Sequence, residues 1–493
     1  MSGQISDHVD VAIVGGGFGG IGMAIALLRA GRTDFVVLER DAEVGGTWWQ
    51  NTYPGCQCDV PSNLYSFSFA LNPGWSQTFP LQPEIGLYLK QVADDFGVRP
   101  YVRTHTDVHG AAWDEQTQRW RIETSRGVLS ARVLVAGMGG LSEPSIPHID
   151  GADSFAGPAF HTARWDHDVE LTGKRVAVIG TGASAVQLVP RIQPQVQQLS
   201  VFQRTPPWIL PHPGRATRPR ERALFKALPR VQQLVRGAIY WGRECYVLPF
   251  RFHRFSRIPQ AMARRHLERQ VADPLLREQL TPRYEIGCKR ILMSDEYFPA
   301  LQQPNTQLIT TAIERITPSG VVTADGVEHP ADVLIWGTGF HTTELPYVEW
   351  LRGRGGRTLG EHWREHGMQA LRGTTVGGFP NLFTLLGPNT ILGHTSVVFM
   401  IESQIAYVMD ALRRLDAHGA VACEPTTQAQ AAFNVTVQRR MQGTVWTKGG
   451  CASWYLDAHG RNTTLWPGSS WTFRRATRRF DAAEYELLGD APA

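Results

Sequence analysis

The sequence has no long run of apolar residues. A helix that crosses a bilayer needs about 18 or more consecutive apolar residues, and no such run occurs among the 493 residues. A short polar leader precedes a strand-like segment at 9–14, without the apolar stretch of a secretory signal. We therefore expect no membrane span and a cytoplasmic location.

Cysteine is scarce, and its spacing fits no metal site. The sequence contains no CxxC pair and no paired CxxC pattern of a zinc site; the six cysteines are Cys56, Cys58, Cys245, Cys288, Cys423 and Cys451. The first two are too close in sequence for an ordinary disulfide. We expect reduced thiols, no bound metal and the reducing conditions of the cytoplasm.

A strong charge of either sign is also missing. The net charge of +4 is mild for a chain of this length, so we expect no nucleic-acid partner. Most of the excess lies between residues 215 and 269, where arginines are interleaved with apolar residues at roughly helical spacing: Arg218, Arg220, Arg222, Arg254, Arg257, Arg264 and Arg265. This pattern favours solvated faces of amphipathic helices, and contact with an anionic cofactor or lipid is the alternative.

The sequence does contain enough apolar material for folded domains. Hydrophobic residues make up 42% and charged residues 19%, which excludes a disordered chain, and the length predicts two or three domains. Two segments, 9–39 and 175–204, share one pattern of apolar strand, glycine-rich turn, helix and second strand. Their turns read GGGFGG and GTGASA. Each pattern is typical of a β-α-β unit that binds a dinucleotide.

The residue at the end of the second strand distinguishes the two units. Glu39 follows Gly15 by 24 positions, and Arg204 follows Gly180 by 24 positions. A carboxylate there accepts hydrogen bonds from ribose hydroxyls and repels a 2′-phosphate, whereas a guanidinium binds a phosphate. The first unit therefore predicts FAD or NAD, with FAD favoured because the first domain closes with a distant C-terminal segment. The second unit predicts NADP.

These observations predict an α/β fold with two Rossmann-like dinucleotide-binding domains and a helical insertion. We expect an FAD-binding domain over 1–145 and 331–493, an NADP-binding domain over 146–215 and 283–330, and the helical insertion over 216–282. The strand expected at 332–336 and the turn at 337–339 would return the chain to the first domain. A long helix from about 397 to 415 would help to complete it.

A flavoprotein that also holds NADPH needs an electron acceptor. A disulfide reductase needs a redox-active cysteine pair beside the flavin, and no cysteine spacing in the sequence supplies one. Molecular oxygen is the remaining common acceptor. The sequence therefore predicts a monooxygenase.

Two further motifs resemble those of the Baeyer–Villiger monooxygenases, a family of class B flavoprotein monooxygenases. Segment 155–166, FAGPAFHTARWD, fills every fixed position of the family's F-x-G-x-x-x-H-x-x-x-W-D fingerprint, and segment 45–59, GGTWWQNTYPGCQCD, is similar to a second family pattern. With the two turns and the Gly-Pro-Asn segment at 387–389, the resemblance covers nearly the whole chain. We interpret His161 and Trp165 of the fingerprint as linker residues that control domain orientation.

The resemblance also implies an active site. Arg290 corresponds to the family's active-site arginine and Asp59 to the aspartate that pairs with it, while Lys289 would assist Arg204 at the 2′-phosphate. Trp454 corresponds to a tryptophan near the NADP ribose. The predicted cofactor-binding residues are Gly15, Gly17, Phe18, Gly20, Glu39, Thr47, Trp48, Asp59, Gly180, Gly182, Ala183, Ser184, Arg204, Thr205, Lys289 and Trp454.

The reaction implied by the resemblance converts a small-molecule ketone to an ester or lactone. NADPH reduces FAD, and reduced FAD reacts with O₂ to a C4a-peroxyflavin, whose anion Arg290 stabilises. Two alternatives stay open: an N- or S-oxidising flavin monooxygenase that acts on amines or sulfides, and a redox-sensing flavoprotein without turnover. The sequence does not specify the ketone, although Trp48, Trp49, Tyr53 and Trp208 suggest an apolar pocket. We expect a monomer or a weak homo-oligomer.

Overall fold

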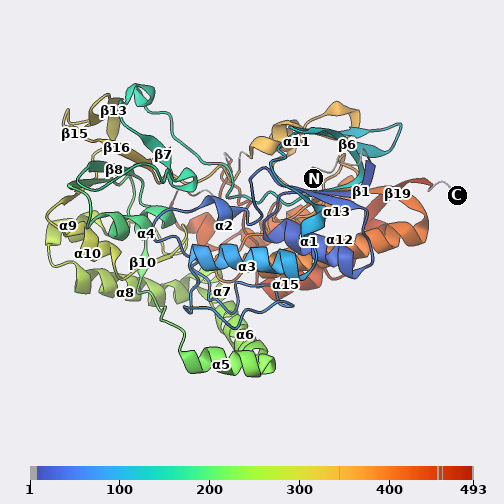
Figure 1. The fold of residues 1–493 in the computed structure, drawn as a ribbon, viewed down its shortest axis with the longest axis horizontal. Helices are drawn as coiled ribbons and strands as arrows, with labels where there is room; N and C mark the ends of the chain where they lie inside the picture. Colours follow the sequence, from blue (N-terminus) through green and yellow to red (C-terminus); the bar gives the residue numbers. More distant parts are fainter. Residues whose placement is uncertain (1–7, 344, 452, 454, 458, 491–493) are drawn as a thin grey trace.

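The molecule has two lobes, each built on its own β-sheet (Figure 1). The computed structural model describes residues 8–343, 345–451, 453, 455–457 and 459–490. The first lobe, on the right in Figure 1, holds both ends of the chain, and the second lobe lies on the left. Among the described residues, no helix combines the length and the apolar character that crossing a bilayer requires.

The first lobe is organised by a sheet with the strand order β17-β4-β5-β6-β1-β2-β3, in which β18 also pairs with β6. Strands β6, β1, β2 and β3 run parallel, and β4 and β5 continue the sheet antiparallel. The elements of this lobe are β1 (His8–Val14), α1 (Phe18–Arg29), β2 (Phe35–Leu38), α2 (Thr47–Gln50), α3 (Gln82–Asp95), η1 (Arg99–Tyr101), β3 (Val102–Arg103), β4 (Val108–Asp114), β5 (Arg119–Thr124), β6 (Gly127–Ala136), η4 (Pro346–Glu349), β17 (Leu351–Arg352), η5 (Arg354–Gly356), α11 (Leu359–His366), β18 (Leu382–Thr384), α12 (Val397–His418), β19 (Ala420–Pro425), α13 (Thr427–Met441), α14 (Val445–Lys448), α15 (Ser470–Ala476), η6 (Ala482–Glu484) and β20 (Tyr485–Asp490).

The second lobe is organised by a parallel sheet with the strand order β12-β9-β8-β16-β7. A small antiparallel sheet, β13-β14-β15, and the pair β10-β11 accompany it. The elements are η2 (Ala152–Ser154), β7 (Ala159–His161), η3 (Thr162–Arg164), β8 (Arg175–Ile179), α4 (Ala183–Ile192), β9 (Gln198–Phe202), β10 (Ile209–Leu210), β11 (Leu292–Met293), α10 (Tyr297–Leu301), β12 (Thr306–Ile309), β13 (Ile313–Thr317), β14 (Gly320–Thr323), β15 (Glu328–Pro330) and β16 (Val333–Trp336).

Strand β16 corrects one expectation about the chain's path. The strand at 332–336 was expected to return the chain to the first domain, but β16 pairs with β8 and β7 inside the sheet of the second lobe. Its four residues are all buried, and a strand buried on both faces belongs in the middle of a parallel sheet. The chain rejoins the first sheet only at β17, which pairs with β4.

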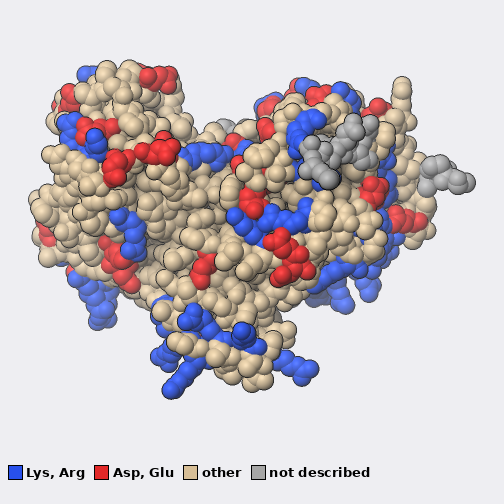
Figure 2. All heavy atoms as spheres, in the orientation of Figure 1, with Lys and Arg blue, Asp and Glu red and all other residues tan. Residues whose placement is uncertain are grey.

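The helical insertion lies between β10 and β11 and consists of α5 (Pro219–Ala227), α6 (Pro229–Glu244), α7 (Val247–Arg251), α8 (His253–Gln270) and α9 (Pro274–Gln279). Helices α5 and α6 project at the bottom of Figure 1, and Lys and Arg side chains gather on this projection in Figure 2. Six of the seven arginines singled out in the sequence are exposed, and Arg222 is half-buried. The interpretation as solvated helix faces is therefore confirmed.

The core of the first lobe lies on both faces of its sheet. Alternate residues of β1 point to opposite sides: Val11 and Ile13 pack in the cluster that also contains buried residues of α1 and α12, and Ala12 and Val14 pack in the cluster with β4 to β6. Because both faces are covered, the central strands are apolar throughout, as is usual for parallel sheets. The carboxyl ends of these strands are therefore the open edge where a ligand can bind.

Candidate active site

The first glycine-rich turn connects β1 to α1. Gly15 has a φ of +101°, which favours glycine, and a Cβ on Gly20 would lie 1.8 Å from the carbonyl oxygen of Gly15. Gly17 caps α1 without a side-chain hydrogen bond. The turn therefore brings the N-terminus of α1 close to β1 and leaves its mouth free of side chains, which fits a pyrophosphate.

Glu39 lies directly against this turn. Its carboxylate, 4% exposed, accepts hydrogen bonds from the backbone N–H of Gly16 at 2.6 Å and of Asp41 at 2.9 Å. Burial raises the pKa of Glu39, although the two backbone donors act in the opposite direction. A fixed carboxylate beside the turn fits an adenosine ribose that has no 2′-phosphate, such as that of FAD.

The segment 45–48 closes the other side of the turn. A Cβ on Gly17 would lie 3.6 Å from the Cα of Gly46, which precedes Thr47 at the start of α2. Trp48 is buried, and its indole N–H donates to the Tyr65 hydroxyl at 3.0 Å. The structure thus places Gly46, and with it the start of α2, beside the first turn.

Phe18 contributes to the site differently from the other predicted residues. Its ring packs against those of Tyr65 and Phe67, each with a centroid distance of 5.2 Å, so the side chain belongs to the core. Phe18 is also the first residue of α1. Its backbone N–H, and not its ring, is therefore the group that can face a phosphate.

The second glycine-rich turn connects β8 to α4. Gly180 has a φ of +109°, and a Cβ there would lie 2.4 Å from the carbonyl oxygen of Gly337. Gly182 caps α4, whose first residues are Ala183 and Ser184. The hydroxyl of Thr181 donates to the carbonyl oxygen of Thr205 at 3.2 Å, which ties the turn to the segment after β9.

Two cations lie together beyond β9. Arg204 is exposed and Lys289 is half-buried. Burial lowers the pKa of Lys289, and the charge of Arg204 lowers it further, so the two groups are electrostatic neighbours. Within the described residues, neither forms an ion pair with a carboxylate. Two uncompensated cations beside a helix N-terminus fit the 2′-phosphate of NADP.

Asp59 and Arg290 form a bidentate ion pair. Arg290 Nε donates to Asp59 Oδ2 at 2.7 Å, and Nη2 donates to Oδ1 at 2.6 Å. The charge of Asp59 raises the pKa of Arg290 above its usual value. Burial acts to raise the pKa of Asp59, but the charge and hydrogen bonds of Arg290 outweigh it and the pKa is lowered. Both groups are therefore charged at neutral pH.

The two halves of this pair come from different parts of the chain. Asp59 follows the segment 53–57, and Arg290 precedes β11, whose Leu292 N–H donates to the carbonyl oxygen of Trp208 at 2.9 Å. The side chains of Arg290 and Asp59 keep 35% and 25% of their surface accessible. The pair is rigid, because two strong parallel hydrogen bonds fix the guanidinium plane, and it remains open to a ligand.

Gln187 of α4 holds the segment that leads to Asp59. Its amide oxygen accepts from the Tyr53 hydroxyl at 2.8 Å, and its amide N–H donates to the carbonyl oxygen of Gln57 at 3.1 Å. Gly55 has a φ of +84°, and a Cβ there would lie 2.6 Å from the carbonyl oxygen of Gln187. The two lobes are therefore in close contact two to six residues before Asp59.

Three of the four aromatic residues suggested for a substrate pocket, Trp48, Tyr53 and Trp208, are buried inside the protein. Trp208 is 2% exposed, and its indole N–H donates to the carbonyl oxygen of Tyr284 at 2.9 Å. Tyr53 is buried against Gln187. Trp49 is half-buried with the Lys90 ammonium 4.6 Å from its ring centroid. Trp208 and Tyr53 are thus core residues, because each is buried and its one polar group is hydrogen-bonded inside the protein.

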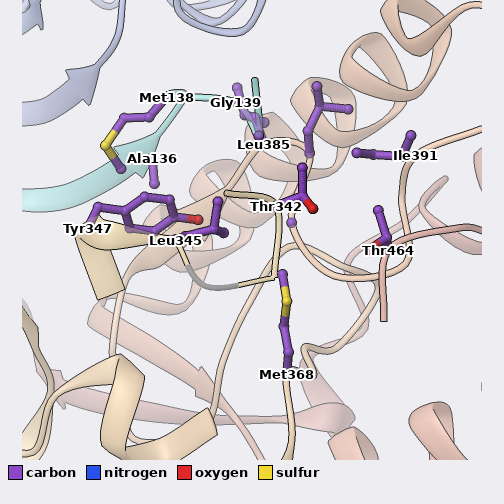
Figure 3. Close-up of a pocket in the computed structure, with 13 residues that line it drawn as sticks. Ala136, Met138, Gly139, Thr342, Leu345, Tyr347, Met368, Leu385, Ile391 and Thr464 are labelled. Carbon is purple, nitrogen blue, oxygen red and sulfur yellow. The ribbon is translucent and has the colours of Figure 1, made fainter. Parts of the chain in front are cut away.

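A small cavity of about 20 Å³ lies at the carboxyl end of β6 (Figure 3). Its wall is mainly apolar and combines residues from five parts of the chain: Ala136, Met138, Gly139, Gly140, Thr342, Leu345, Tyr347, Met368, Leu385, Leu386, Gly387, Ile391 and Thr464. A cavity of this size holds about one water molecule. Its place at the strand ends matches the edge where open α/β sheets bind ligands.

His161 and Trp165, the two fingerprint residues interpreted as linker residues, contact other side chains and backbone groups of their own segment. His161 ends β7 at 3% exposure, and its Nδ1 accepts from the backbone N–H of Ala163 at 3.0 Å. Burial lowers the pKa of His161 to about 4, so the ring is neutral at pH 7. Trp165 packs edge-on against Phe160 at 5.1 Å. These contacts support the interpretation of the two residues as linker residues.

The structure differs from the expectation that all cysteines are reduced. Cys288 and Cys451 form a disulfide with a Cα–Cα distance of 6.2 Å across 163 residues, while Cys56, Cys58, Cys245 and Cys423 are free. The prediction was wrong because the pairing depends on the tertiary fold, not on local spacing. Trp454, predicted near the NADP ribose, lies outside the described residues, which contain no cluster of three metal-binding side chains.

One residue near the ion pair was not predicted from the sequence. Arg243, in α6, donates from Nη2 to the backbone carbonyl of Asp59 at 3.4 Å. It shares one face of α6 with Gln232 and Arg236, because the three are spaced by 4 and 7 positions. That spacing of long polar side chains is the signal that could have identified it.

Comparisons with known proteins agree with this geometry. Residues 12–234 match the family model described as pyridine nucleotide-disulphide oxidoreductase. The chain is 52% identical to a Baeyer-Villiger monooxygenase of Streptomyces coelicolor over 99% of this chain and 95% of that protein. The crystal structure of OTEMO in complex with FAD and NADP has 26% identity and a TM-score of 0.86, covering 98% of this chain and all of that one.

A further structure, an oxidised steroid monooxygenase bound to NADP, has 32% identity and a TM-score of 0.85, again over 98% of this chain and 100% of that chain. The two glycine-rich turns and the Asp59–Arg290 pair lie within the aligned part of these proteins. On the basis of its identity to the Streptomyces protein over nearly its whole length, the chain belongs to the Baeyer–Villiger monooxygenase family.

Proposed function

We propose that the protein uses FAD and NADPH to insert one oxygen atom of O₂ next to the carbonyl carbon of a ketone, which gives an ester or lactone. The observation that carries this proposal is the Asp59–Arg290 pair, which holds the guanidinium of Arg290 in a fixed orientation and leaves it partly accessible. Ketone, O₂, NADPH and a proton are converted to ester, NADP⁺ and water.

When bound, FAD accepts two electrons from NADPH and activates O₂ for transfer of one oxygen atom. The chain's own residues bind and separate the two nucleotides. Glu39 accepts hydrogen bonds from the ribose of the first, and Arg204 with Lys289 neutralises the 2′-phosphate of the second. The turns at Gly15 and Gly180 direct backbone N–H groups to the pyrophosphates.

Arg290 supplies the charge that the oxygen transfer requires. Asp59 uses Nε and one N–H of Nη2, so the Nη1 edge of the guanidinium is left for the substrate oxygen. Negative charge develops on that oxygen when the ketone carbon becomes tetrahedral, and a prepositioned cation stabilises it without reorganisation. Asp59 fixes the orientation of Arg290 and does not need to accept a proton.

The alternative of an N- or S-oxidising monooxygenase gives this pair no role. Amines and sulfides attack as nucleophiles, so no oxyanion forms on the substrate. A redox sensor without turnover is the second alternative. Measuring ester formed and NADPH consumed separates all three, because only the proposed activity yields ester in proportion to NADPH when a ketone is present.

The proposal also covers the substrate, the oligomeric state, the location and the domain boundaries. We infer a small-molecule ketone and O₂ as the partners, a monomer or weak homo-oligomer, and a cytoplasmic location. A relative named steroid monooxygenase motivates a panel of linear, cyclic, aryl and steroid ketones. For the domains we propose an FAD-binding part that opens at 1–145 and an NADP-binding part that extends past β16, because that strand pairs with β8.

The decisive experiment separates the two half-reactions in Arg290→Ala. Removing one oxyanion donor costs about 10²–10³ in rate, so we expect this variant to bind FAD, to be reduced by NADPH and to form ester at least 100-fold more slowly. Asp59→Ala should show a milder loss, because Arg290 keeps its charge but loses its orientation. Ester formation by Arg290→Ala at nearly the wild-type rate would contradict the proposal.

A further inference from the structure

The helical insertion reaches the ion pair through one face of α6. Gln232, Arg236 and Arg243 lie on this face, and the first two donate to backbone carbonyls within the segment 63–72 at 2.7–3.1 Å. Arg243, the last of the three, donates to the carbonyl oxygen of Asp59, the residue at which the segment 59–72 begins. The insertion is therefore fastened along the segment that starts with Asp59.

Arg243 is an uncompensated cation. Its side chain is half-buried, and its Nε is enclosed without a hydrogen-bond partner among the described residues. No carboxylate of those residues lies within ion-pair distance of its guanidinium. The adjacent Glu244 is engaged elsewhere, since it accepts from the backbone N–H and the hydroxyl of Ser470 at 3.0 and 2.6 Å. Burying a charge without a counterion is costly, and such groups concentrate at functional sites.

The charges of Arg243, Asp59 and Arg290 act on one another. Burial lowers the pKa of Arg243, the charge of Asp59 raises it, and the charge of Arg290 lowers it. The Asp59 carboxylate is already neutralised by Arg290 through two hydrogen bonds. The cluster of three groups therefore carries one net positive charge, which would be absent without Arg243.

We propose that Arg243 is a positioning residue of the oxygenation, which holds Asp59 by its backbone carbonyl and gives the Asp59–Arg290 pair its net positive charge. This inference rests on the proposed function. An oxyanion bound to Arg290 would lie close to the negative charge of Asp59, and the positive charge of Arg243, which is hydrogen-bonded to the backbone of Asp59, offsets that repulsion. The insertion thereby contributes to the reaction without contacting the substrate.

The test compares three substitutions of Arg243 with a matched control on the same helix face. Arg243→Met removes charge and donors, Arg243→Gln keeps a donor without charge, and Arg243→Lys keeps the charge. Arg236→Met removes another arginine that contacts backbone carbonyls of the same segment, four or more residues beyond Asp59. Each FAD-loaded variant is assayed for ester formed per NADPH consumed and for the midpoint potential of its bound FAD.

We expect Arg243→Met and Arg243→Gln to form on the order of tenfold less ester per NADPH, less than the 10²–10³ cost of a direct oxyanion donor. Their FAD potential should become more negative, because a nearby positive charge favours the reduced, more electron-rich flavin. Arg243→Lys should recover most of both properties. Arg236→Met should keep both at wild-type values even if its Tm falls.

Wild-type ester yield and FAD potential in Arg243→Gln would overturn the inference, as would equal losses in Arg243→Lys and Arg236→Met, which would mean that only packing matters. If Arg243→Met fails to retain FAD, the comparison of Arg243→Gln with Arg243→Lys decides. Absence of ester from the wild type with every ketone would instead overturn the proposed function. The FAD potentials would then still test the charge of Arg243.

Discussion

The two glycine-rich turns share a geometry but differ in how their recognition residue is held. Glu39 is buried and accepts two backbone hydrogen bonds, one from Gly16 of the turn and one from Asp41. Arg204 is exposed, and its cationic neighbour Lys289 repels it. A carboxylate can be preorganised by the protein's own amides, whereas two cations side by side are stabilised only when an anion binds. Glu39 is therefore held in place by the protein alone, whereas Arg204 and Lys289 have no carboxylate partner among the described residues.

Gly20→Ala should break the first turn and produce the largest effect. Its Cβ would lie 1.8 Å from the carbonyl oxygen of Gly15, so the turn cannot keep its shape. The corresponding position of the second turn is Ala185, which is buried without difficulty. We expect Gly20→Ala to lose bound FAD on purification, as measured by absorbance. Gly237→Ala is the control, since no atom lies within 4 Å of its Cβ, and a fully FAD-loaded Gly20→Ala would contradict the prediction.

Arg204→Ala, at the second turn, should weaken the binding of NADPH much more than that of NADH. A charge-assisted hydrogen bond contributes roughly 1.5–3 kcal/mol, so we expect the KM for NADPH to rise about 10- to 150-fold. The KM for NADH should change by no more than about twofold, because NADH has no 2′-phosphate. Steady-state kinetics with both nucleotides checks this. Equal increases for the two would mean that Arg204 does not recognise the phosphate.

His161, which lies between the two glycine-rich units in the sequence, should make the free energy of unfolding depend on pH. Burial lowers the pKa of His161 from 6.5 to about 4, so folding favours the neutral ring. The stabilisation is complete above pH 6.5 and is lost as the pH falls toward 4, by about 3 kcal/mol in total. We expect the Tm of His161→Asn to fall less than that of the wild type between pH 7 and 4. Parallel Tm curves would show that His161 does not titrate in this way.

The disulfide should affect stability without a dependence on nucleotide. It joins the loop that carries Lys289 to the C-terminal part of the chain, and closing a long loop stabilises a fold by roughly 2–5 kcal/mol. We expect Cys451→Ala to lower the Tm by a few degrees, and a reductant to lower the wild-type Tm to the same value. Cys245→Ala, at a free and exposed cysteine, is the control. A Tm that no reductant or substitution changes would contradict the pairing.

Local sequence was sufficient where function depends on local geometry. The two turns, Glu39 and Arg204 follow from spacing alone, because a strand, a turn and a helix occupy fixed lengths of chain. The resemblance to a known family supplied Asp59 and Arg290, which are 231 residues apart. It did not supply the hydrogen bond from Arg243 to the backbone of Asp59, because that contact depends on where the helical insertion packs.

The errors have the same physical origin. Whether β16 joins the first or the second sheet is decided by its pairing partners, and its apolar residues would suit either. Cys288 and Cys451 meet only in the folded chain. Phe18 stays a predicted cofactor residue through its backbone N–H alone, because its ring packs against Tyr65 and Phe67. A motif identifies a backbone position, and it does not determine where an apolar side chain points.

Gln187 connects the helix of the second glycine-rich turn to the segment that precedes Asp59. Helix α4 directs its first N–H groups to one nucleotide, and one turn further along it carries Gln187, whose hydrogen bonds hold the segment just before Asp59. The hydrogen bonds of Gln187 therefore connect the helix that follows the second glycine-rich turn to the segment that leads to Asp59, so that the position of this segment depends on the position of α4.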